Sequence, residues 1–223
     1  MKNPGNGTIE QTRAERIARA SKDAVRVELP QIDVRTFAVT LNGLSPLIVH
    51  KFSEKSRKEI EDKQQKKAKG AKEVRVPRNE YLASFYMLGG TEPETPKAVY
   101  GVPASAFKNA AVDACTFVDG MTKVEARGAF HVIADEGPLV KITDHSAPTM
   151  REDTVRIGMG TLDLRYRPEF TEWSVTLRIR YNHAAISPEQ IVNLFSLAGF
   201  SIGVGEWRPQ RDGMNGMFEV KRA

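Results

Sequence analysis

The sequence predicts an α+β protein whose main strands and helices follow the order β-α-β-β-α-β. Four segments alternate apolar and polar side chains, as half-buried strands do, and two others place apolar residues on one helical face. The strands are expected at 34–41, 126–133, 173–181 and 217–221, and the helices at 103–118 and 187–198. This is the ferredoxin-like, or RRM-like, order. Residues 44–98 and 135–170 are then large insertions in it.

The first strand and the first helix have clear ends in the sequence. The strand at 34–41 stops at Asn42-Gly43, a pair of turn residues. Pro103 stands where a helix can begin, and the apolar helical face that follows runs from Ala106 to Val118. Cys115 lies within this helix and is expected to be a small core residue rather than a nucleophile.

The C-terminal part carries the strongest strand and helix signals. Residues 173–181 alternate without a break. Ser187 is expected to cap the next helix, with Pro188 at its first position, and Gly199 is expected to end it. Further short strands are expected at 139–142, 155–157 and 162–167.

The composition indicates a globular cytoplasmic protein, in the host cytoplasm if it is viral. The chain has 223 residues, of which 40% are hydrophobic and 27% charged, so it can bury a core. No apolar run approaches the roughly 18 residues that span a bilayer, and the start of the chain lacks the apolar core of a signal peptide. The single cysteine cannot form an internal disulfide. We therefore expect no membrane contact.

Positive charge is concentrated in the N-terminal third. The net charge is +5, and residues 1–80 hold 18 Lys and Arg against 11 Asp and Glu. Such an excess favours phosphate backbones through Coulomb attraction and counterion release. We expect residues 1–29 to be a polar arm, either frayed or partner-binding. Residues 30–223 are expected to form a single domain with a basic insertion at about 51–80.

The basic insertion has almost no apolar stripe, only Phe52 and Ile60. A helix of this kind cannot offset its ordering entropy by burial, so it is exposed, mobile or ordered by a partner. It is either a solvated charged helix or a flexible basic finger over a nucleic-acid strand. In the second case the contacts come from its cations, namely Lys51, Lys55, Arg57, Lys58, Lys66, Lys67 and Lys69.

A glycine-rich loop at 199–216 is the feature that most favours nucleic-acid binding. Its glycines allow positive φ and the close approach of another backbone, its arginines supply charge, and Trp207 offers a stacking surface. The alternative is a surface loop that needs glycine only for its turns. The residues expected to contact a strand are Gly203, Gly205, Trp207, Arg208, Arg211, Gly213 and Gly216.

Four strand arginines form a second candidate surface. Arg165 with Arg167, and Arg178 with Arg180, alternate on one face of their strands. An RRM-like sheet face is a common platform for single strands. The alternative is that neighbouring acidic side chains neutralise these arginines in surface pairs of little energetic weight.

A ferredoxin-like order with a glycine-rich loop between the last helix and the last strand resembles the RAMP superfamily of CRISPR-associated repeat-binding proteins. The resemblance is strongest over residues 172–223. Its closest form is a Cas7-like backbone subunit, which coats a strand of guide RNA. The C-terminal segment also resembles proteins of unknown function from tailed phages. A phage single-stranded DNA-binding protein on the same kind of fold is the alternative to a CRISPR subunit. The resemblance implies that the nucleic-acid backbone is touched by Gly203, Gly205, Arg208, Gly213 and Gly216.

Catalytic signals are weaker than binding signals. The four histidines show no paired metal spacing, and the sequence has neither a P-loop nor a GxGxxG motif before a helix. We expect a non-catalytic protein, without cofactor or metal, that binds single-stranded RNA or DNA as a homo-oligomer or within a multi-subunit assembly. Two alternatives remain. One is a viral structural or assembly protein, and the other is a RAMP-type endoribonuclease with His50 as its general base.

Overall fold

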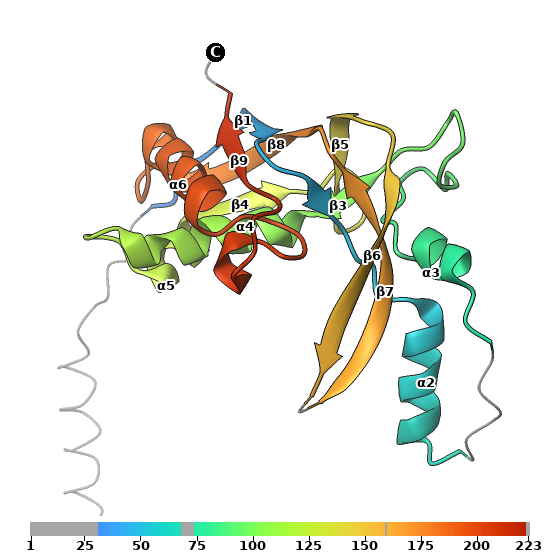
Figure 1. Ribbon diagram of the computed structural model, residues 1–223. Coiled ribbons are helices and arrows are strands. Elements are labelled where there is room, and N and C mark those ends of the chain that lie inside the picture. Colours follow the sequence, from blue (N-terminus) through green and yellow to red (C-terminus); the bar gives the residue numbers. More distant parts are fainter. Residues whose placement is uncertain (1–30, 68–73, 159, 222–223) are drawn as a thin grey trace, which may run out of the picture. The chain divides into compact units, whose positions relative to one another are not determined.

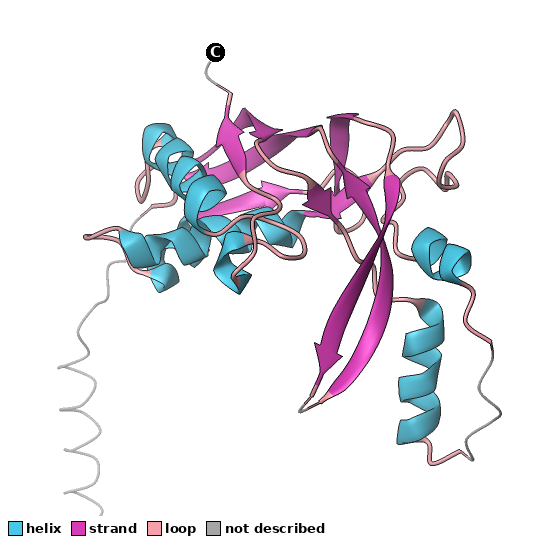
Figure 2. Cartoon of the chain, viewed as in Figure 1, coloured by secondary structure: helices cyan, strands magenta, loops and turns pink. Residues whose placement is uncertain are grey.

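The computed structural model describes residues 31–67, 74–158 and 160–221. The chain divides into two units, residues 1–32 and 33–223, and the account below concerns the second. The predicted polar arm at 1–29 lies outside the described residues, and the single domain expected at 30–223 stays a prediction. Figure 2 shows that strands and helices are interspersed along the described part of the chain.

The order of elements follows the labels of Figure 1. The helices are α2 (Glu54–Gln64), α3 (Pro77–Ala83), α4 (Ala104–Ala114), α5 (Lys123–Ala129) and α6 (Pro188–Ser201), with short 3-10 helices η1 (Cys115–Phe117) and η2 (Pro209–Arg211). The strands are β1 (Val34–Gly43), β2 (Leu47–Ile48), β3 (Gly101–Pro103), β4 (Phe130–Ile133), β5 (Leu139–His145), β6 (Thr149–Ile157), β7 (Thr161–Phe170), β8 (Trp173–Asn182) and β9 (Phe218–Val220).

The main sheet has the strand order that the ferredoxin-like fold requires. β9 pairs with β1, β1 with β8, and both β4 and β5 with the other edge of β8, all antiparallel. β4 lies along the C-terminal half of β8 and β5 along its N-terminal half, so together they fill the place of one strand. Four strands and two helices in this order and direction confirm the predicted fold class.

Alternating side chains give the main sheet one buried and one open face. Leu177 of β8 is fully buried and shares a core with Phe107 of α4 and Phe195 of α6. Burying a side chain of this size stabilises the fold by about 1.5–3 kcal/mol. The helices α4 and α6 lie on the same side of the sheet (Figure 1). The other face carries Arg178 and Arg180, both exposed.

The helix α6 begins where the sequence predicts and ends later. Ser187 caps it and Pro188 is its first residue, but the predicted stop at Gly199 is wrong. A Cβ on Gly199 would overlap the carbonyl oxygen of Phe218, so the missing side chain lets α6 pack closely on β9. The left-handed residue that ends a helix is Gly203, with φ of +69°.

The predicted strand at 126–133 is only half right. Its first residues belong to α5, and the strand β4 begins at Phe130. Thr122 and Glu125 form a reciprocal capping box, in which each side chain bonds the backbone N–H of the other. This local pattern starts a helix at the next residue, and it overrides the apolar alternation.

The insertion at 135–170 builds a long hairpin, β6–β7, which pairs with β2 in a three-stranded sheet. Both strands are longer than the expected 155–157 and 162–167. One face of the hairpin is a ladder of ion pairs. Arg151 contacts Asp153 at 2.9 Å and Glu169 at 2.7 Å. Charges that alternate in this way neutralise each other along the strand pair.

The helix α2 buries no apolar stripe, as predicted. Phe52 is 58% exposed and Ile60 is 48% exposed. No helix in the described part of the chain is long and apolar enough to cross a membrane.

Candidate nucleic-acid interface

The glycine-rich loop, residues 199–216, is folded tightly against β2. The N–H of Glu206 donates to the carbonyl oxygen of Ile48 at 3.0 Å, and the N–H of Gly216 donates to that of Pro46 at 2.8 Å. Three glycines hold φ angles that only glycine adopts without strain, and the loop therefore has a fixed shape. They are Gly203 at +69°, Gly205 at +77° and Gly216 at +67°.

The glycines of this loop meet the chain's own backbone. A Cβ on Gly213 would overlap the carbonyl oxygen of Trp207, and a Cβ on Gly205 would crowd that of Ile48. A Cβ on Gly216 would likewise overlap the carbonyl oxygen of Val204. A Cβ on Gly203 would crowd the ring of Pro209, which is a side chain. The sequence predicts a close approach, which is confirmed, but the approaching backbone is that of the protein. The four glycines therefore shape the loop, and the direct nucleic-acid contacts predicted for them stay a prediction.

Trp207 is held in an uncommon backbone conformation at the surface. Its φ is +51°, in a region that bulky residues rarely occupy. Trp207 is 39% exposed. The carbonyl oxygen of Trp207 accepts a hydrogen bond from the N–H of Asn215 at 3.0 Å, which helps to fix this conformation. A strained residue of this type costs about 1–3 kcal/mol and is most common at functional positions.

Arg208 is anchored beside Trp207 with part of its guanidinium left free. Its Nη1 donates to the carbonyl oxygen of Gly205 at 3.0 Å, and its Nε and Nη2 donate to Oε1 of Gln210 at 3.2 and 3.0 Å. Three of the five N–H groups of an arginine are thereby used. Arg211, in η2, is exposed. The loop thus presents two cations next to one aromatic ring, as predicted.

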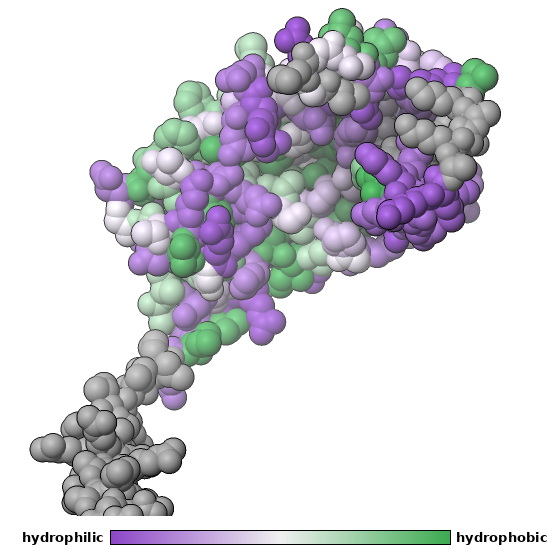
Figure 3. All heavy atoms as spheres, turned by 90° about the horizontal axis from the view of Figure 1, so that it is seen from below, coloured by the Kyte–Doolittle hydropathy of each residue, from purple (hydrophilic) through white to green (hydrophobic). Residues whose placement is uncertain are grey.

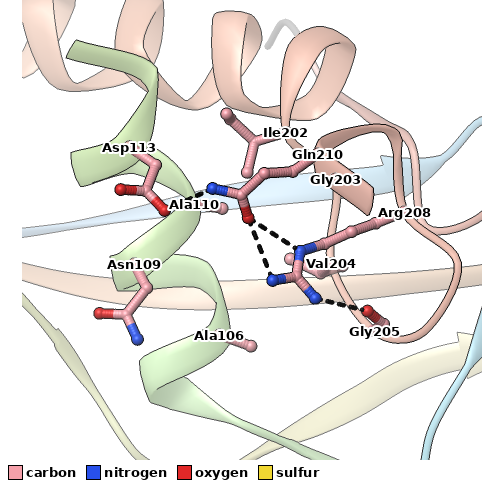
Figure 4. Close-up of a pocket in the computed structure, with 10 residues that line it drawn as sticks. All are labelled: Ala106, Asn109, Ala110, Asp113, Ile202, Gly203, Val204, Gly205, Arg208 and Gln210. Carbon is pink, nitrogen blue, oxygen red and sulfur yellow. Dashed lines mark hydrogen bonds between the residues drawn. The ribbon is translucent and has the colours of Figure 1, made fainter. Parts of the chain in front are cut away.

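Gln210 and Asp113 complete the loop, and sequence reasoning missed both. Nε2 of Gln210 donates to Oδ2 of Asp113 at 2.8 Å, across 97 positions in the sequence. Asp113 lies on α4 and also contacts Lys123 at 2.8 Å. Figure 4 shows the line of polar groups from α4 through Gln210 to Arg208. No local pattern marks this link, because it depends on how the loop packs against α4.

Arg167 is an internal residue that joins the hairpin to the glycine-rich loop. It is 2% exposed, and it contacts Asp153 of β6 at 2.8 Å and Glu206 of the loop at 3.2 Å. Its Nε has no hydrogen-bond partner among the described residues. The sequence predicts a surface cation here, and that expectation is corrected.

The other strand arginines do not form one surface. Arg165 lies in the three-stranded sheet and pairs with Asp163 at 3.0 Å. Arg178 and Arg180 lie on the open face of the main sheet, away from the helix side on which the loop packs. Arg178 donates to the carbonyl oxygen of Ala134 at 3.2 Å. The four arginines are therefore divided between two sheets.

The basic insertion presents a charged helix whose cations are partly neutralised. Arg57 contacts Glu61 at 3.0 Å and Lys67 contacts Asp62 at 2.9 Å. Figure 3 shows hydrophilic side chains gathered over α2, at the right of the view. Its role as a finger over a strand stays a prediction. Lys51, Lys58 and Lys66 are exposed, whereas Lys69 and the side chain of Lys55 lie outside what the structure describes.

The two side chains singled out for chemistry are partly or fully buried. His50 is half-buried after β2, and burial lowers its pKa, which favours the neutral imidazole. Cys115 is buried, and burial raises the pKa of its thiol, so it is a core residue as predicted. Within the described residues, no three His, Cys, Asp or Glu side chains gather closely enough to hold a metal ion. A general-base role for His50 stays a prediction.

Comparisons with known proteins give likeness in structure but not in sequence. No family model matches the chain, and no curated protein matches it. A chain of the cryo-EM structure of type III-B Cmr-beta bound to cognate target RNA is similar, with 10% identity and a TM-score of 0.48. The match covers 97% of the present chain and 66% of that one, so this protein spans less than two thirds of its length.

A second solved structure has a similar degree of likeness. Cmr6 from Pyrococcus furiosus, in a crystal structure, is 12% identical with a TM-score of 0.43, over 86% of this chain and 100% of that one. Both neighbours are Cmr proteins by name. Because the TM-scores and identities are low, the fold assignment rests on strand order and register, and the neighbours carry no argument about chemistry.

Proposed function

We propose that this protein binds single-stranded nucleic acid, RNA or DNA, through the glycine-rich loop, and does so without cutting it. The observation that supports this most is Trp207, an aromatic side chain exposed at the surface on a strained backbone with φ of +51°. A base stacked on such a ring gains about 1–3 kcal/mol, whichever base it is. Several copies of the protein, or further subunits, are then proposed to line the strand.

Charge beside the ring supports the same proposal. Arg208 keeps two N–H groups free after its bonds to Gly205 and Gln210, and Arg211 is exposed three residues further on. Guanidinium groups next to an aromatic ring can hold phosphates while the ring holds a base. The fixed shape of the loop reduces the entropy lost on binding.

The loop is favoured over the open sheet face as the main contact. On the open face, β1 and β8 present small polar or apolar side chains together with Arg178 and Arg180. No aromatic side chain of these two strands lies on that face, whereas RRM-type platforms stack bases on aromatic rings. The sheet arginines are therefore a matched comparison for the loop arginines.

The experiment compares two double variants that remove the same charge. Binding of a fluorescent single strand is measured between about 50 and 200 mM salt. Arg208→Ala with Arg211→Ala should weaken binding and reduce the salt slope by about 0.7 for each phosphate contact that the variant loses. Arg178→Ala with Arg180→Ala should leave both quantities near those of the wild type. Unchanged binding in the loop variant would refute the role of the loop.

A further inference from the structure

A pocket lies between the glycine-rich loop and α4. Its volume is about 120 Å³, roughly the space of four water molecules. Ala106 and Ala110 of α4 form one wall, and Gly203, Val204 and Gly205 form the other (Figure 4). These side chains are small or absent, so they leave the space between α4 and the loop open.

Polar groups surround this space with both donors and acceptors. Arg208 contributes the two N–H groups that its own contacts leave free. Asn109 also lines the pocket, and its amide makes no hydrogen bond to the described residues. Asp113 contributes a carboxylate that Lys123 and Gln210 already hold in place.

The carboxylate of Asp113 stays ionised. Burial alone would raise the pKa of this group, but hydrogen bonds from Lys123 and Gln210 outweigh burial and keep the pKa below its ordinary value. Each carboxylate oxygen accepts one of these bonds at 2.8 Å, and each has a second lone pair for another donor.

This mixture of donors and acceptors favours a neutral base over a phosphate. A phosphodiester would gain from Arg208, but it carries acceptors only and leaves the free lone pairs of Asp113 without a partner. A nucleobase has two flat apolar faces, and its edge carries donors and acceptors together. A guanidinium pairs best with guanine, which offers O6 and N7 side by side, and the amino and imino N–H groups of guanine suit a carboxylate.

We propose that this pocket receives one unstacked nucleobase of the bound strand, with guanine preferred. The proposal rests on the function proposed above, since the strand that crosses Trp207 and Arg208 supplies the base. The protein then prefers one base at one position of the strand, while the rest of the contact does not depend on the base sequence. At the pocket, the two free N–H groups of Arg208 bond the acceptor edge of this base in place of a phosphate, and Asp113 accepts from its donor edge. Asn109 offers its amide, which bonds none of the described residues, to the same base.

The test uses single strands of about twelve uridines or thymidines, a length within the usual site sizes of single-strand binders. A second set carries one central guanine, adenine or cytosine. The full-length protein should bind the guanine strand about ten-fold more tightly than the others, as one bidentate base contact gives. Equal affinities for all strands, or a preference for another base, would overturn the proposal.

Two variants locate the preference in the pocket. Ala106→Leu fills the space without changing charge, and it should remove the guanine preference while the uridine strand still binds. Ser105→Leu is its control, because Ser105 is the exposed neighbour on α4 and does not line the pocket; the preference should survive there. Asn109→Ala, at an exposed position, should reduce the preference even if the leucine variant fails to fold.

The outcomes separate this proposal from the one on which it rests. If the wild type binds every strand equally and the Arg208→Ala, Arg211→Ala variant binds none well, the loop function stands and the base pocket is refuted. If the wild type binds no strand, the proposed function itself fails. If the guanine preference persists unchanged in both Ala106→Leu and Asn109→Ala, the preference arises elsewhere.

Discussion

Gly213 shows how closely single residues of the loop are fitted to each other. A Cβ at this position would overlap the carbonyl oxygen of Trp207, a backbone atom that cannot turn aside. We expect Gly213→Ala to destabilise the fold by about 1–3 kcal/mol, as overpacking does, and to release Trp207 from its strained conformation. Urea denaturation followed by circular dichroism measures the first effect.

Gly128 provides the matched control for that substitution. It lies inside α5, and a Cβ there would meet no atom within 4 Å. Gly128→Ala should therefore leave stability unchanged or raise it by up to about 1 kcal/mol, because alanine favours the helix. Equal losses in the two variants would show that the loop glycine is not specially fitted.

At the residue scale, the sequence predicts the types of side chain in the loop but not all of their roles. The exposure of Trp207 and the presence of two cations follow from the local sequence. The glycines are harder to interpret. A positive φ and the close approach of another backbone are needed equally where a ligand contacts the loop and where the loop packs on its own chain. Arg167 is misread because its strand alternates like its neighbours, while the acids that bury it come from β6 and the loop.

At the scale of elements, Arg167 links the β6–β7 hairpin to the loop. Arg167→Met would leave the buried carboxylate of Asp153 without this partner, whereas the side chain of Glu206 is 44% exposed and would stay hydrated. We expect a loss of about 3 kcal/mol, since breaking a buried ion pair strands a charge, although Arg151 still contacts Asp153. The free energy of unfolding is measured by urea titration near neutral pH.

Arg165 is the comparison for this element-scale prediction. It lies two residues away on the same strand, pairs with Asp163, and has a side chain that is 34% exposed. Arg165→Met should cost no more than about 1 kcal/mol, because exposed ion pairs contribute little. A loss as large as that of Arg167→Met would contradict the role given to the buried link.

Element boundaries follow local capping signals more closely than apolar patterns. Ser187 and Pro188 predict the start of α6 correctly, whereas the Thr122–Glu125 capping box marks a helix that the apolar pattern conceals. The end of α6 is misread because Gly199 is required by the approach to β9. Such packing between distant segments leaves no signature in the local sequence.

At the scale of the whole molecule, the strand order was predictable and the grouping of site residues was not. The β-α-β-β-α-β order follows from periodicity along the chain. Whether Arg165 and Arg178 share a face depends on the β6–β7 hairpin, which pairs with β2 in a separate sheet, while β5 of the same insertion joins the main sheet. The pocket beside α4 likewise needs Asp113 and Gln210 to meet across 97 positions.

The central claim is that a single strand crosses the loop at Trp207, and intrinsic fluorescence tests it most directly. The chain has two tryptophans, and Trp173 is 4% exposed with its Nε1 donating to the carbonyl oxygen of Ser45. Only Trp207 is therefore placed to stack with a base. The measurement is a titration of the wild type and Trp207→Ala with a single-stranded oligonucleotide. We predict quenching in the wild type, none in the variant, and an affinity loss of about 1–3 kcal/mol. Tight binding that leaves wild-type fluorescence unchanged, or equal affinities of the two proteins, would contradict the account.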